Sequence, residues 1–209
     1  MLGLNDALIF IIQTLGSLYL LIVLMRFILQ LVRANFYNPL CQFVVKATQP
    51  LLKPLRRVIP SLFGLDMSSL VLALLLQILL FVVVLTLNGY QAFTVLLLPW
   101  ALIGIFSLFL KILFWSMIIS VILSWVAPGS RSPGAELVYQ ITEPVLAPFR
   151  RLIPNLGGLD ISPIFAFIAI QLIQSWVIPR LAFYAFMPKE LFGLISVSYT
   201  HLTLPTNRE

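Results

Sequence analysis

Residues 48–69 read TQPLLKPLRRVIPSLFGLDMSS, and residues 142–163 read TEPVLAPFRRLIPNLGGLDISP. The two stretches align without a gap when the chain is shifted by the 94 residues that separate position 48 from position 142. The shared motif residues are Pro50, Pro54, Arg56, Arg57, Pro60, Gly64 and Asp66 in the first stretch, and Pro144, Pro148, Arg150, Arg151, Pro154, Gly158 and Asp160 in the second. Chance does not align so many prolines, an arginine pair and a Gly-Leu-Asp in this way, so the sequence indicates an internal duplication.

The composition indicates an integral membrane protein. Hydrophobic residues make up 61% of the chain and charged residues only 10%, and the mean hydropathy is +1.07. A soluble domain carries about 25% charged residues, so this chain lacks the polar groups to cover a surface in water. The first apolar run lacks the basic flank and cleavage site of a signal peptide, and we expect it to be a retained helix.

Four apolar segments are near the roughly 20 residues that cross a bilayer. They lie at about 7–31, 67–87, 101–126 and 162–186. The stretch 91–126 is too long for one helix, and the repeat places the third span at 101–126 with 91–100 as a connector. We therefore predict an all-α membrane protein with four transmembrane helices, arranged as two tandem helix–loop–helix repeats at residues 1–94 and 95–190.

The distribution of basic residues predicts the orientation. Each repeat has two spans, so both polar loops must lie on the same side of the membrane. Loop 26–66 holds six Lys and Arg residues and loop 128–160 holds three, nine of the 13 in the chain, whereas the connector 88–100 holds none. The positive-inside rule then predicts cytoplasmic loops and outward termini in a bacterial inner membrane.

Each loop is expected to contain a short amphipathic helix. Asn38 and Ser132 are good N-caps, and each precedes a proline, which suits the first helical position. Apolar residues follow at helical spacing, which favours a helix in the membrane interface, although a helix packed on the bundle remains the alternative. Pro50 and Pro54 should not both fit in one regular helix, so we predict a kinked segment.

The arginine pairs are the candidate binding residues. Arg56, Arg57, Arg150 and Arg151 would share one face, where they could bind anionic lipid headgroups or an acidic membrane or cytoplasmic protein. Retention of orientation is the alternative role, because it needs only positive charge. The net charge of +6 is first of all a topology signal, so no nucleic-acid partner is expected.

Polar residues at the spans form the second group of candidates. Asp66 and Asp160 should lie at the positive ends of transmembrane helices, and Ser162 with Pro163 has an N-cap pattern. Structural anchoring is the favoured role of the aspartates, and ion binding is the alternative. Three polar side chains fall within the spans and are candidates for helix–helix hydrogen bonds or, for the lysine, for function: Gln77, Lys111 and Gln171.

No catalytic, cofactor or metal motif appears in the sequence. The chain has one histidine, His201, and one cysteine, Cys41, and no glycine-rich phosphate loop or nucleophile motif. We therefore expect neither an enzyme nor a cofactor. Residues 196–209 turn polar and match nothing in the repeat, and we expect them to be a non-native tail, translated from adapter sequence.

The paired segments P-x-x-x-P-x-R-R-x-I-P with a following G-L-D-x-S, at Pro50–Ser68 and Pro144–Ser162, resemble the YggT family, which is related to the plastid and cyanobacterial YlmG proteins. The resemblance covers both repeats and implies no catalytic residues. It implies a scaffold or assembly role, in cell division and nucleoid organisation or in assembly of membrane cytochrome complexes. It also leaves open a small transporter or channel subunit for osmotic or ion tolerance, in which case Lys111, Gln77 and Gln171 would face a wet cavity. A homo-oligomer is compatible with either role.

Overall fold

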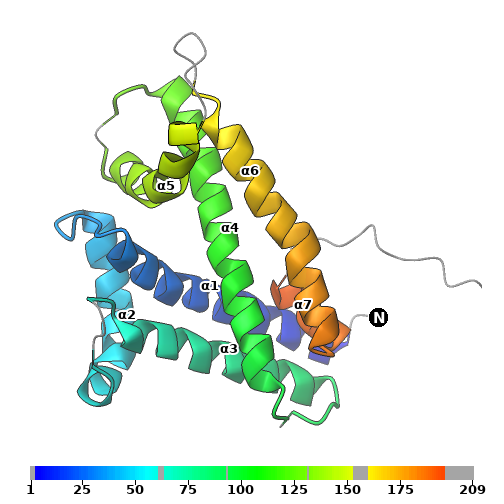
Figure 1. The fold of residues 1–209 in the computed structure, drawn as a ribbon. Coiled ribbons are helices and arrows are strands. Elements are labelled where there is room, and N and C mark those ends of the chain that lie inside the picture. Colours follow the sequence, from blue (N-terminus) through cyan, green and yellow to red (C-terminus); the bar gives the residue numbers. More distant parts are fainter. Residues whose placement is uncertain (1–2, 61–63, 93, 131, 153–159, 196–209) are drawn as a thin grey trace, which may run out of the picture.

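The computed structural model describes residues 3–60, 64–92, 94–130, 132–152 and 160–195. In this part of the chain, short connections join elements that are all helices (Figure 1). The helices are α1 (Leu4–Leu31), α2 (Pro39–Val58), α3 (Met67–Leu87), α4 (Leu97–Val126), α5 (Pro133–Leu152), α6 (Ser162–Leu172), the π-helix η1 (Ile173–Val177), α7 (Ile178–Tyr184), the 3-10 helix η2 (Lys189–Leu191) and α8 (Phe192–Ile195). The four predicted spans correspond to α1, α3, α4 and the continuous run α6–η1–α7. The predicted fold class is confirmed.

The spans pack as two helical hairpins, one per repeat. In the first, α1 lies against α3, and in the second, α4 lies against α6 and α7. The hairpins are joined where α3 packs on α4. Small residues allow close approach at both contacts: a Cβ on Gly16 would lie 2.2 Å from Leu80 Cδ2, and one on Gly104 would lie 3.0 Å from Gln77 Nε2.

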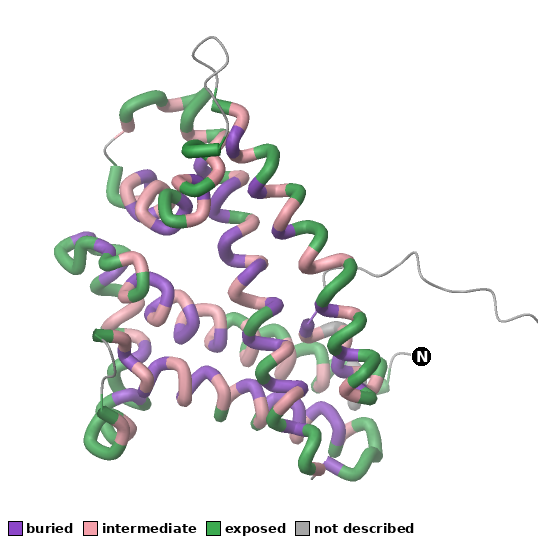
Figure 2. The backbone as a smooth tube through the Cα atoms, in the orientation of Figure 1, coloured by how far each residue is buried: buried purple, intermediate pink, exposed green. Residues whose placement is uncertain are grey.

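The outer surfaces of these helices are apolar. In Figure 2, buried residues alternate along each helix with exposed ones. Only 17% to 44% of the residues in the most apolar window of each span are buried, and large side chains such as Phe10, Leu15 and Ile122 are exposed. Exposed apolar surface on this scale would be an aggregation liability in water. It suits helices whose solvent is lipid.

The third span begins earlier than the sequence predicted. The expected start was residue 101, with 91–100 as connector, but α4 begins at Leu97. Pro99 does not prevent this, because a proline in the first helical turn removes an N–H that has no partner within the helix. The Nε1 atom of Trp100 donates a hydrogen bond of 2.7 Å to the carbonyl of Ala185, and this bond ties the start of α4 to the end of the fourth span.

The fourth span contains a short π-helix before a proline. Pro179 has no N–H to donate back to the turn before it, and η1 takes up the mismatch just upstream. The N–H of Ile178 reaches Ile173, five residues back. After α7 the chain returns as η2 and α8, and Ser107 of α4 donates a hydrogen bond of 2.6 Å to the carbonyl of Ile195.

The prediction that Pro50 and Pro54 would interrupt the loop helix is wrong. Both lie inside α2, and Pro144 and Pro148 lie inside α5. All four prolines are exposed and the members of each pair are four residues apart. The carbonyl groups that lose an N–H partner therefore share one outward face, where water or headgroups can satisfy them. The N-caps are as predicted: the Asn38 side chain accepts from the N–H of Leu40 at 2.9 Å, and α5 begins directly after Ser132.

Helix α2 has three distinct faces. One packs on the bundle through buried residues such as Cys41, Thr48 and Leu52. The second is an exposed apolar stripe at helical spacing, formed by Leu40, Phe43, Leu51 and Val58. The third is an exposed basic stripe, formed by Lys46, Lys53 and Arg57. The two predicted positions of this helix, in the membrane interface or packed on the bundle, are thus compatible. Packing uses only the buried face and leaves the apolar and basic stripes exposed.

Candidate interaction site at the two elbows

The repeated motif lies between α2 and α3 and between α5 and α6. We call the described residues 56–60 and 64–66 the first elbow, and the described residues 150–152 with Asp160 the second elbow. Gly64 has φ +78°, which a side chain would strain, and its carbonyl accepts a hydrogen bond of 3.0 Å from Gln30 Nε2 of α1. The motif residues Pro154 and Gly158 lie outside the described residues.

Asp66 is the centre of the first elbow. It is buried, with a side chain only 6% exposed. Arg56 binds its Oδ2 through Nε at 3.1 Å and also through a terminal nitrogen. The hydroxyl of Ser69 donates to the same oxygen at 2.9 Å. The aspartate therefore fastens the end of α2 to the start of α3.

Arg26 completes this cluster from α1. The sequence analysis counted its charge with the polar loop, although the predicted span 7–31 includes it, and the structure places it in that span. Its side chain is 7% exposed, and its Nε lies 3.8 Å from Asp66 Oδ2. Its Nη1 donates to Thr48 Oγ1 at 2.6 Å and to the carbonyl of Val45 at 3.0 Å. Arg26 thus binds α1 to both α2 and the first elbow. The signal that could have found it is the apolar stretch of residues 27–32, which continues the helix beyond the charge.

The charges of the first elbow decide the protonation of Asp66. Burial raises the pKa of Asp66, but hydrogen bonds from Arg56 and Ser69 and the charges of Arg56 and Arg26 outweigh it and leave the pKa below its ordinary value. Asp66 is therefore ionised at neutral pH. A small polar pocket of about 300 Å³ lies beside the cluster, lined by Gln30, Arg56, Ile59, Pro60 and Asp66.

The second elbow has the same aspartate–arginine pair in a wetter setting. Arg150 Nε lies 2.8 Å from Asp160 Oδ2, and its Nη1 lies 2.7 Å from Glu143 Oε2. The Asp160 side chain is 37% exposed and that of Glu143 is 58% exposed. Asp160 also accepts from the N–H of Ser162 at 2.9 Å. That serine is the first residue of α6 rather than its N-cap, so the helix begins one residue earlier than the sequence pattern indicated.

Each repeated arginine pair splits into two roles. Arg56 and Arg150 are held by aspartates, as described above. Arg57 and Arg151 are exposed, and among the residues that the structure describes neither takes part in an ion pair. The sequence grouped the four arginines as one candidate binding set. Within the described part of the chain, Arg57 and Arg151 are the members of that set without an ion-pair partner.

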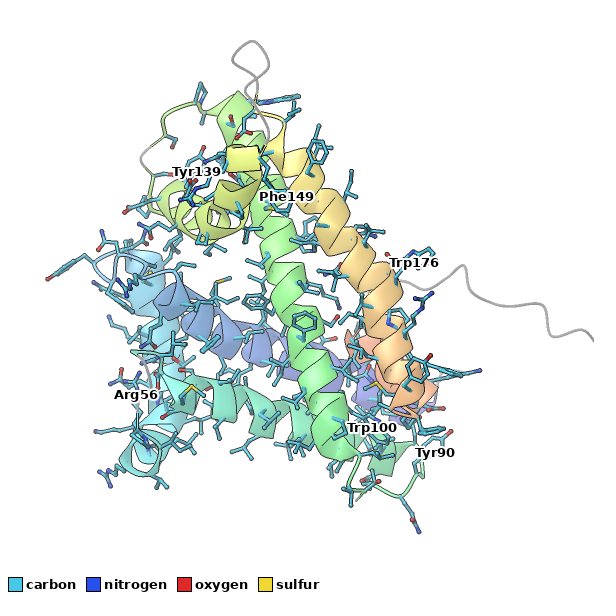
Figure 3. The ribbon with its side chains drawn as sticks, in the orientation of Figure 1. Arg56, Tyr90, Trp100, Tyr139, Phe149 and Trp176 are labelled. Carbon is cyan, nitrogen blue, oxygen red and sulfur yellow. The ribbon has the colours of Figure 1, made fainter. Side chains whose placement is uncertain are left out.

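The two elbows belong to one end of the bundle. Near the start of α2, Asn38 Nδ2 donates a hydrogen bond of 2.7 Å to the carbonyl of Pro133, and the N–H of Asn35 donates to Gln140 Oε1 at 3.2 Å. Helices α2 and α5 thus touch, and both lie away from the end that holds α7 (Figure 1). Figure 3 shows Arg56 at this end and Trp100 at the other.

The intramembrane candidates do not converge. Gln77 is buried where α3 meets Gly104 of α4. Gln171 is exposed, and its Nε2 donates to Ser175 Oγ at 3.2 Å within its own span, so the expected bond to another helix is not formed. Lys111 is half-buried on α4, and neither it nor Gln77 lines the groove that contains Gln171. Within the described part of the chain, no group of three or more His, Cys, Asp or Glu residues could hold a metal ion.

Comparison with known proteins assigns the fold to a family. A sequence model of CCB3/YggT matches the chain twice, over residues 5–87 and 99–181, once in each repeat. The chain belongs to the CCB3/YggT family. An uncharacterized protein of Pseudomonas aeruginosa is 63% identical to this YggT-family chain over 193 residues, which cover 91% of the chain and 98% of that relative.

Other YggT-family relatives are more distant but similarly complete. The uncharacterized protein YggT of Escherichia coli K12 is 37% identical over 175 residues, covering 82% of this chain and 89% of the relative. An uncharacterized protein of Vibrio alginolyticus is 45% identical over 164 residues, covering 78% and 88%. No solved structure matches the chain. The match therefore establishes a multi-pass membrane protein with two YggT repeats, and the names of these relatives state no activity.

Proposed function

We propose that this chain is a non-enzymatic membrane scaffold or assembly factor that captures an acidic protein partner at its two elbows. The observation that carries the proposal is the division of each arginine pair. Arg56 and Arg150 are fixed by aspartates at the starts of α3 and α6, so the neighbouring Arg57 and Arg151 are presented on a rigid base. Because the backbone beside them is fixed, binding a carboxylate has to order only the side chains of Arg57 and Arg151.

The faces of α2 support a position at the membrane surface. Its exposed apolar stripe would enter the boundary of the acyl chains, and its basic stripe of Lys46, Lys53 and Arg57 would lie at the headgroup level. This position would bring the elbows to the surface that the positive-inside rule assigns to the cytoplasm. Anionic headgroups would then surround α2 and the two elbows and hold them at the membrane surface.

A transporter or channel role has less support. A pathway needs polar groups that line a common space. Gln77 is buried at the contact between α3 and α4, whereas Gln171 lies in an outward groove. The scaffold role is therefore the one that we carry forward.

The test is partner capture by a double variant. Arg57→Gln with Arg151→Gln removes both free guanidinium groups and leaves the aspartate-bound pair intact. The matched control, Arg180→Gln with Lys189→Gln, removes two exposed positive charges from the other end of the bundle. Proximity labelling in the native host should lose its main protein neighbours in the elbow variant and keep them in the control.

Equal insertion of both variants, measured by membrane fractionation, makes the comparison valid. An unchanged set of labelled neighbours in the elbow variant would refute the scaffold proposal. A loss of affinity for anionic vesicles without any change in protein neighbours would assign the elbows to lipid binding instead, and would also refute it.

A further inference from the structure

Among the residues that the structure describes, one contact between the two repeats has no counterpart on the second repeat. In the first repeat, α1 and α3 form a seat, which we call the first seat and define by Leu20, Leu24, Ala73, Gln77 and Phe81. All five residues are buried. Helix α4, the first helix of the second repeat, contacts both α1 and α3 and covers this seat. Gly104 of α4 lies directly over Gln77 and Phe81.

The equivalent seat in the second repeat is open. Adding 94 to each position gives Phe114, Ile118, Phe167, Gln171 and Ser175, which we call the second seat. All five residues line a groove of about 580 Å³ between α4 and α6–η1. Gln171 is exposed there, whereas its counterpart Gln77 is 2% exposed. Trp176, at the rim of the groove, lies on the outer side of the molecule (Figure 3).

The chain also carries an uncovered helix face of the matching kind. Gly104 of α4 meets the first seat, and Ala101, Ile105 and Ile112 lie on the same face of the helix by their spacing. All four are buried. Subtracting 94 gives Ala7, Phe10, Ile11 and Leu18 of α1, and these residues are exposed. They lie about one or two helical turns apart, so they form one stripe. Thr14, between them, is also exposed.

The large and small residues at this contact have exchanged sides between the repeats. At the first seat, Phe81 in the seat faces Gly104 in the covering helix, and a Cβ on Gly104 would lie 3.3 Å from Phe81 Cζ. At the second seat, Ser175 stands where Phe81 does, and Phe10 of α1 stands where Gly104 does. A bulky phenyl ring on α1 therefore matches the room left by the serine.

We propose that α1 of a second copy of this chain occupies the second seat, just as α4 occupies the first. Each chain has one open seat and one uncovered first helix, so two copies can satisfy each other. Both copies insert in the same orientation, and the internal contact between Gln77 and Gly104 already places such a helix at the right depth. Two chains joined in this way close into a ring of four repeats about an axis perpendicular to the membrane.

Burial of Gln171 supplies part of the driving force. A glutamine exposed to hydrocarbon is unfavourable, and packing against a neighbouring helix removes it from lipid. The same contact buries the exposed apolar side chains of the groove and of the α1 stripe. The assembly is independent of the elbow arginines, so its failure and the failure of the scaffold proposal are separable.

The test uses disulfide cross-linking between two differently tagged copies in bacterial membranes. One copy carries Phe10→Cys and the other Ser175→Cys, and the native Cys41 can remain because it is fully buried. A disulfide needs Cα atoms within about 7 Å, so only close contact should yield a product. We expect a covalent dimer of doubled mass when both variants are present and none from either alone.

Phe10→Cys paired with Leu102→Cys is the control, because Leu102 is exposed on α4 outside the groove and lies two residues from position 104, the counterpart of Phe10. Cross-linking in the control at the level of the test pair would show random collision and overturn the proposal. Absence of the Phe10–Ser175 product in normally inserted chains would overturn it as well. A product from Ser175→Cys alone would indicate a different, seat-to-seat interface and would also overturn it.

A single chain that carries both substitutions tests the closure. Two chains in a ring should form a cyclic covalent dimer, whereas an open array should form a ladder of larger species. A ladder would contradict the two-chain ring.

Discussion

The two repeats share a motif, yet the aspartate of the first elbow is buried and that of the second is partly exposed. In the first repeat, the buried Asp66 lies between the partly exposed Arg56 and the buried Arg26. In the second, Ser120 stands in the place of Arg26, and Glu143 stands in the place of Gln49. The cluster of the first elbow therefore has two arginines for one carboxylate, and that of the second has one arginine for two. The two copies of the motif therefore build different clusters, a buried anchor in the first elbow and an exposed one in the second.

The same contrast holds in the membrane, where the first seat is covered and the second is open. The largest expected effect tests it. Phe81→Ala should lower the free energy of unfolding by about 4 kcal/mol, because it empties a fully buried site. Its counterpart Ser175→Ala should change stability by less than about 1 kcal/mol, since it removes only the hydrogen bond that Gln171 donates to the hydroxyl in an open groove. Thermal unfolding in detergent compares the two, and similar losses would contradict the covered and open assignment.

The next effect separates the two aspartates. Asp66→Asn should cost about 3 kcal/mol, because it leaves the buried Arg26 without a counter-charge. Asp160→Asn is the matched change at the exposed elbow and should cost less than about 1 kcal/mol. Equal costs, measured by the same unfolding assay, would mean that the buried cluster does not distinguish the repeats.

Acid should weaken the first elbow by the same interaction. The folded pKa of Asp66 lies below its unfolded value, so this contribution to stability is complete above the unfolded pKa of about 3.9. It is lost as the pH falls through the folded pKa. The difference in unfolding temperature between the wild type and Asp66→Asn should therefore shrink when the pH is lowered from 7 to 3. A constant difference would show that the ion pair is not its source.

The smallest effect distinguishes the two arginines within one pair. Arg56→Gln should cost about 1 kcal/mol, since the side chain of Arg56 is partly exposed although it binds Asp66. Arg57→Gln, one residue further on, should be within about 0.5 kcal/mol of the wild type. A clear loss of stability in Arg57→Gln would mean that Arg57 is not the free partner-binding group proposed above.

The sequence alone predicts some features of this molecule and not others. The duplication, the four spans and the caps at Asn38 and Ser132 follow from local patterns and from the repeat, and the structure confirms them. Arg26 could not be placed in the same way, because its partners Thr48 and Asp66 are distant in the chain and meet it only through packing.

The prolines show that a local rule can also predict a helix break that does not form. A local rule forbids proline inside a helix, but the rule assumes that the freed carbonyl groups find no partner. Pro50 and Pro54 are exposed on one face of α2, where other donors can satisfy the freed carbonyl groups and the free-energy cost of the lost hydrogen bonds is reduced. The open second seat was likewise invisible in the sequence, since it depends on which helix covers which.

The most direct test of the duplicated architecture is the membrane sidedness of the elbows. Arg57→Cys and Arg151→Cys would be labelled separately in intact cells and in inverted vesicles with a thiol reagent that does not cross membranes. Cys41 gives little background, because burial raises the pKa of its thiol. If both elbows lie on the cytoplasmic side, as the duplicated architecture requires, both positions react only in inverted vesicles. Labelling of one position from outside and the other from inside would contradict it.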